Sequence, residues 1–81
     1  MNDRIFAAIR SMVSMADRRG DQALATAFTE AATIYEHYGD LSGTLAELNV
    51  RRQKISGRER VANDWVYNWL RDVEAGVPPR G

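Results

Sequence analysis

How the second half of the chain folds depends on residues 41–57, whose sequence is LSGTLAELNVRRQKISG. In one interpretation, residues 41–56 form a continuous helix with a single apolar stripe. That stripe passes through Arg52, and Val50 points away from it, so this interpretation explains neither residue. The apolar members of the stripe are Leu41, Leu45, Leu48 and Ile55.

The second interpretation breaks the helix at Asn49, a residue type that tolerates the left-handed backbone conformation. Residues 41–48 and the residues from 51 onward then become two short helices set at an angle. Such a break leaves the basic residues outside and buries Val50 together with Leu45, Leu48 and Ile55. Because this arrangement accounts for both Val50 and Arg52, we favour the break at Asn49.

The residues before this segment predict two helices joined by a short turn. A helix over residues 4–19 has apolar side chains at helical spacing, and the glycine after it supplies a left-handed stop. Asp21 can cap a second helix over residues 22–38. Gly39 and Asp40 then repeat the signals for a stop and a restart.

The residues after this segment predict a last helix, which starts within residues 58–62 and ends at Ala75. Tyr67 falls on its polar face and is a candidate for an exposed aromatic contact. The opposite face is wide and apolar, so we expect its large side chains in the core. These are Val61, Trp65, Val66, Trp69, Leu70 and Val73.

These patterns predict an all-α fold, because no segment has the period-two alternation of a strand. We expect a compact bundle of four to five short helices, with a helix-turn-helix-like element at residues 41–58. The bundle should be a single domain over residues 1–76, followed by a flexible C-terminal tail over residues 77–81.

The composition narrows the class of protein. A chain of 81 residues buries only about 60% of its unfolded surface, so we expect pairing with a second copy, a homodimer. It has no cysteine, which excludes disulfides and thiolate metal sites. Its apolar runs are far shorter than the roughly 20 residues that span a bilayer, and its start lacks a secretory signal pattern. We therefore expect a cytoplasmic protein that does not enter a membrane.

The net charge of the chain is zero, but the charges are unevenly distributed. Residues 1–50 hold four basic and seven acidic side chains, a net charge of −3. Residues 51–60 hold five basic side chains against Glu59 alone, a net charge of +4. A local positive field of this kind can attract an anionic partner even when the whole chain is neutral.

Residues 48–56, with the sequence LNVRRQKIS, resemble the turn and recognition helix of helix-turn-helix DNA-binding regulators. Asn49 takes the place of the turn glycine in that pattern, and Val50 and Ile55 match its buried positions. The chain departs from the pattern at Arg51, where the family usually has a serine or threonine cap. The resemblance implies a small, non-enzymatic transcriptional regulator, and because two-fold operators need two copies it also implies a dimer.

The basic segment carries the chemistry that DNA recognition needs. Arginine can make paired contacts to guanine, glutamine can do so to adenine, and any cation can neutralise a phosphate. We therefore expect duplex DNA as the partner. The candidate binding residues are Arg51, Arg52, Gln53, Lys54, Ser56, Arg58 and Arg60.

The alternative function is a small helical protein–protein interaction module, such as a phage- or plasmid-type inhibitor or adaptor. It would meet an acidic protein partner through the basic segment, or a partner of another kind through an exposed apolar helix face. One unbroken helix with Val50 exposed favours this module, whereas a turn at Asn49 favours DNA.

We expect no catalytic residues, metal site or cofactor. His37 is the only histidine, and no cysteine is available to complete a metal site with it. The sequence has no phosphate-binding glycine loop and no nucleophile with an evident histidine partner. These features favour a binding protein over an enzyme.

Overall fold

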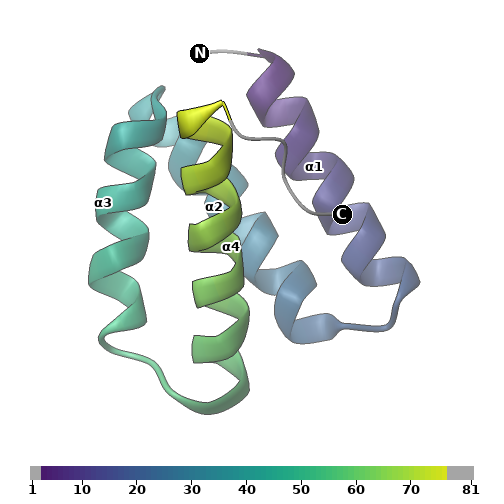
Figure 1. Cartoon of the computed structure of the whole chain (residues 1–81). Helices are drawn as coiled ribbons and strands as arrows, with labels where there is room; N and C mark the ends of the chain where they lie inside the picture. Colours follow the sequence, from purple (N-terminus) through teal and green to yellow (C-terminus); the bar gives the residue numbers. More distant parts are fainter. Residues whose placement is uncertain (1–2, 77–81) are drawn as a thin grey trace.

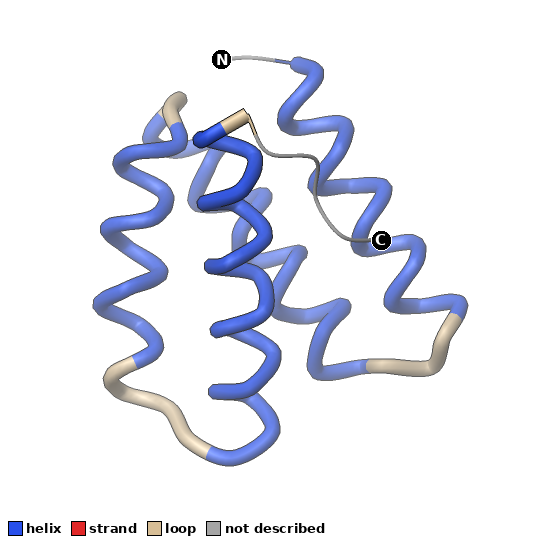
Figure 2. The backbone as a smooth tube through the Cα atoms, in the orientation of Figure 1, coloured by secondary structure: helices blue, strands red, loops and turns tan. Residues whose placement is uncertain are grey.

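The computed structural model describes residues 3–76, which fold into four helices joined by short turns (Figure 1). Figure 2 shows only helices and loops over these residues, with no strand among them. The helices are α1 (Asp3–Arg18), α2 (Gln22–Tyr38), α3 (Leu41–Arg52) and α4 (Gly57–Ala75). The predicted all-α bundle of four to five short helices is confirmed. The tail expected over residues 77–81 lies outside the described residues.

Helix α2 is the element on which the others assemble. It packs against α1 on one side and against α3 and α4 on the other. No Cα atom of α1 lies within 8 Å of a Cα atom of α3 or α4. In Figure 1 this arrangement places α1 apart from the α3–α4 hairpin, with α2 running between and behind them.

The core is centred on Phe28 of α2, whose side chain is completely buried. Its ring lies near-perpendicular to the rings of Trp65 and Trp69 of α4, with ring centroids 5.6 and 5.5 Å away. This T-shaped geometry is the favourable one for aromatic pairs. The other helices contribute buried side chains to the same core, among them Ile9, Tyr35, Leu48, Val66 and Leu70.

Local signals define the turns, as the sequence predicts. Asp21 caps α2, because its carboxylate Oδ1 accepts a hydrogen bond from the backbone N–H of Leu24 at 3.1 Å. Asp40 caps α3 in the same way by accepting from the N–H of Gly43 at 2.6 Å. Gly39, between α2 and α3, adopts the predicted left-handed conformation, with φ of 78°.

The predicted break at Asn49 is wrong. Helix α3 runs through Asn49 without interruption and ends at Arg52. Residues 41–58 do contain two helices and a turn, but the turn comprises residues 53–56. Val50, which the broken helix would bury, is 47% exposed.

The physical reason for this difference is the glycine at the start of α4. Left-handed backbone costs a residue with a Cβ about 1–2 kcal/mol. Among the described residues, positive φ occurs only at glycines, and Gly57 adopts it with φ of 61°. The change of direction between α3 and α4 therefore uses Gly57, and Asn49 stays helical.

The conformation at Asn49 can be tested by two substitutions. Asn49→Ala should raise the free energy of unfolding by about 0.5 kcal/mol, because alanine is the better helix former, and Asn49→Gly should lower it relative to alanine by about 1 kcal/mol. Urea denaturation followed by circular dichroism measures both values. A turn at Asn49 predicts the opposite order, with the glycine variant the more stable of the two.

Candidate functional site

The first predicted binding residue, Arg51, connects α3 to α2. Its Nη1 lies 3.1 Å from Oε2 of Glu30 on α2. Its Nε lies 3.7 Å from Oε2 of Glu47, one turn earlier on α3. The guanidinium therefore faces two carboxylates of its own chain.

Arg52 and Arg60 converge on one carboxylate of α4. Arg52 Nη1 lies 3.7 Å from Asp64 Oδ1, and Arg60 Nε donates to Asp64 Oδ2 at 3.1 Å. The guanidinium carbon of Arg52 also lies 4.3 Å from the centre of the Tyr67 ring, a cation–π contact. Tyr67, predicted as an exposed aromatic, is therefore half-buried under an arginine.

The remaining four predicted residues, Gln53, Lys54, Ser56 and Arg58, are exposed. They lie in the turn after α3 and at the start of α4 and do not form a helix of their own. The structure thus does not gather the seven residues onto one recognition helix. It places three of them in ion pairs within the chain and four on the surface.

Helix α4 exposes apolar side chains that the sequence pattern assigns to the core. Val66, Trp69 and Leu70 are buried, as predicted. Val61, however, is 69% exposed, and Trp65 is 36% exposed. Helix α4 packs against α2 and α3, and no Cα atom of α1 lies within 8 Å of it, so part of its predicted apolar face stays exposed.

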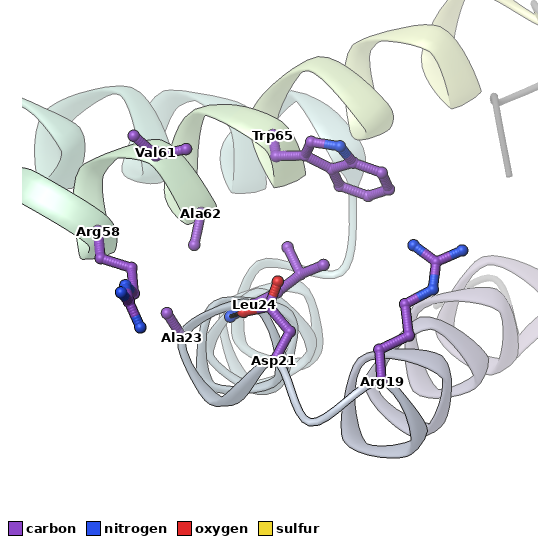
Figure 3. A pocket seen from close by; sticks show the side chains of 8 residues that line it. All are labelled: Arg19, Asp21, Ala23, Leu24, Arg58, Val61, Ala62 and Trp65. Carbon is purple, nitrogen blue, oxygen red and sulfur yellow. Dashed lines mark hydrogen bonds between the residues drawn. The ribbon is translucent and has the colours of Figure 1, made fainter.

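These two side chains border a pocket of about 180 Å³ between the α1–α2 turn and the first turns of α4 (Figure 3). We call it the Arg19–Arg58 pocket. Its remaining wall residues are small or aliphatic, or lie at the α2 N-terminus: Asp21, Ala23, Leu24 and Ala62. Figure 3 shows Leu24 in the middle, with the Arg58 side chain on one side of it and the Arg19 side chain on the other.

Positive charge exceeds negative charge among the residues that line this pocket. Arg19 and Arg58 are exposed, and within residues 3–76 neither forms an ion pair with a carboxylate. Asp21 is the only acidic residue that lines the pocket, and its carboxylate accepts the N–H of Leu24 as the cap of α2. The pocket therefore presents an apolar surface between two cations that have no partner among the described residues.

A second pocket, of about 310 Å³, lies on the other side of the α2–α4 contact and is acidic. Glu30 and Glu59 line it together with Asn63. Asn63 is 2% exposed, and its side-chain oxygen has no hydrogen-bond partner among the described residues. The two pockets thus have opposite charge, and they share Ala23 at their border.

The other titratable residues are the remaining candidates for metal ligands. Within residues 3–76, no cluster of three or more histidine or carboxylate side chains could hold a metal ion. His37 is exposed and meets the ring of Tyr38 edge-on. The hydroxyl of Tyr38 donates to Glu47, and this hydrogen bond, together with the negative charge of the carboxylate, raises the pKa of Tyr38 above its usual value.

The predicted site does not include the residues around the Arg19–Arg58 pocket, apart from Arg58. Arg19 and Arg58 are far apart in the sequence, so only the fold brings them to one pocket. A signal does exist on α4, where Arg58, Val61 and Trp65 lie at helical spacing on one face.

No family model, curated protein or solved structure matches the chain. None of the four helices is both long and apolar enough to cross a bilayer over the described residues.

The role of Arg52 can be tested with a double-mutant cycle. Arg52→Ala, Tyr67→Ala and the double variant should give a coupling free energy of about 0.5–1 kcal/mol in urea denaturation, because the guanidinium stacks on the ring. Tyr67→Phe keeps the ring and should keep the stability of the wild type. Additive effects of the two alanine substitutions would contradict this contact.

Proposed function

We propose that this protein is a non-enzymatic protein-interaction module that binds its partner through α4 and the α1–α2 turn. The observation that carries the proposal is the exposure of Val61 and Trp65 beside the Arg19–Arg58 pocket. Exposed apolar side chains next to a hollow are typical of binding surfaces. Tryptophan and arginine are also the residue types that contribute most to binding energy in protein interfaces.

The path of α3 supports the same function. The sequence allows two outcomes for residues 41–57, and the one with an unbroken helix and Val50 exposed favours a protein-interaction module. Helix α3 has that form. Its C-terminal arginines hold α3 against α2 and α4 and do not project from a separate recognition helix.

The distribution of charge makes duplex DNA the weaker candidate. Arg51, Arg52 and Arg60 would have to leave carboxylates of their own chain to reach phosphates. Lys54 and Arg58 remain exposed in the basic segment. Contacts to phosphates supply a large share of the affinity for DNA, and these two cations can make few of them.

The proposal predicts capture of a protein that depends on Val61 and does not depend on nucleic acid. The full chain is immobilised and exposed to lysate from its own host, with and without nuclease. Wild type and Val50→Ser should retain the same proteins, measured by quantitative mass spectrometry. Val61→Ser should lose them by about tenfold or more, because fully burying a valine side chain contributes about 1.5–3 kcal/mol. Both valines are exposed, so each substitution should change stability by only about 0.5 kcal/mol or less.

A titration of labelled duplex DNA provides the opposing test. We expect no saturable binding at physiological salt. Steep loss of affinity between about 50 and 200 mM salt, together with loss of binding in Lys54→Glu, would instead support DNA as the partner.

A further inference from the structure

We propose that the Arg19–Arg58 pocket takes one apolar side chain that is flanked by carboxylates, on a segment of the partner protein. This inference rests on the proposed function and specifies the chemistry of the partner. It follows from the volume of the pocket, the rigidity of its apolar wall and the charges at its edge.

The volume of the pocket suits a single apolar side chain. At about 180 Å³, it is slightly larger than an apolar cavity of about 150 Å³ that accepts benzene in another protein. Leu24, Ala62 and Val61 offer aliphatic surface to such a group. A leucine or phenylalanine side chain of the partner therefore fits the available space.

The wall that this side chain would meet is held in place before binding. The Trp65 ring packs edge-on against the buried Phe28, with 5.6 Å between the ring centroids. The same side chain also lines the pocket (Figure 3). Because the ring is already ordered by the core, little conformational entropy is lost when a partner covers it.

The charges at the edge of the pocket select acidic neighbours. The Arg19 and Arg58 side chains stand on opposite sides of Leu24 (Figure 3), and neither is paired with a carboxylate of residues 3–76. Guanidinium groups bind carboxylates through two parallel hydrogen bonds. An apolar side chain with an acidic residue on either side would therefore satisfy both cations while it fills the pocket.

The N-termini of two nearby helices also favour a carboxylate of the partner at this pocket. Helices α2 and α4 both begin at the pocket, and helix N-termini carry partial positive charge. Asp21 already caps α2, but the side chain of Ser56 makes no capping hydrogen bond at α4. A carboxylate beside Arg58 is thus favoured by the start of α4 as well as by the arginine.

Selection from a library of short random peptides tests the proposal and needs no candidate partner. The peptides are displayed on phage, selected on the immobilised full chain, and counter-selected on the Val61→Ser variant. We expect the enriched sequences to share one leucine or phenylalanine with aspartate or glutamate on both sides. Enrichment of basic or uncharged sequences, or no enrichment over the starting library, overturns the proposal.

The best selected peptide is then synthesised and titrated into isotopically labelled protein. Amide shifts should concentrate at residues 19–24 and 58–65, and binding should weaken with salt. Arg19→Glu and Arg58→Glu should each lower the affinity by about tenfold or more, and Lys54→Glu, an exposed cation away from the pocket, should leave it unchanged. Shifts centred on residues 50–54 overturn the proposal, as do concentration-dependent shifts at the pocket without peptide, which indicate a second copy as its occupant.

Failure of this inference can be distinguished from failure of the proposed function. If the peptides lack the acidic pattern while protein capture still depends on Val61, only the partner chemistry is wrong. If capture does not depend on Val61, the interaction surface itself is wrong.

Discussion

The structure depends on the burial of α2 against helices on two sides. Phe28 of α2 is completely buried in this arrangement and forms T-shaped contacts with both Trp65 and Trp69. Helix α1 packs mainly on α2, since no Cα atom of α1 lies within 8 Å of a Cα atom of α3 or α4. Within residues 3–76, α4 packs against α2 and α3, and Val61 lies on a part of α4 that these helices leave exposed. The candidate binding surface is therefore a consequence of how the core is built.

The run of arginines after Asn49 has a structural role in this bundle. Arg51 links α3 to Glu30 of α2, and Arg52 links it to Asp64 of α4. Ion pairs at such exposed positions contribute only about 0.2–1 kcal/mol each, but the stacking of Arg52 on Tyr67 adds to the second link. These contacts hold the end of α3 in place where a single turn connects it to α4. The local excess of positive charge is thus partly balanced by acidic residues that are distant in the sequence.

Sequence patterns predict those structural features that depend on residues close together in the sequence. The caps at Asp21 and Asp40 and the stop at Gly39 follow from local hydrogen bonding and backbone sterics, and the structure confirms them. The break at Asn49 rests on the assumption that Val50 must be buried, although valine at the surface is common. The exposure of Val61 could not be predicted, because it depends on the position of α1. The meeting of Arg19 with Arg58 likewise depends on how α2 and α4 pack.

Trp65 belongs to both the core and the proposed binding surface, and this double role links stability to binding. Its ring forms a T-shaped contact with the buried Phe28 and also lines the pocket. A substitution at Trp65 therefore changes both the stability of the fold and the binding of a partner. Val61 is exposed, so a substitution there should change binding with little effect on stability. A domain of this size leaves much of its apolar surface in water, and any partner that binds only the folded state stabilises that state by mass action. A partner that covers Trp65 would bury apolar surface that the helices of this chain leave exposed. Binding at this surface should therefore raise the free energy of unfolding of the bundle.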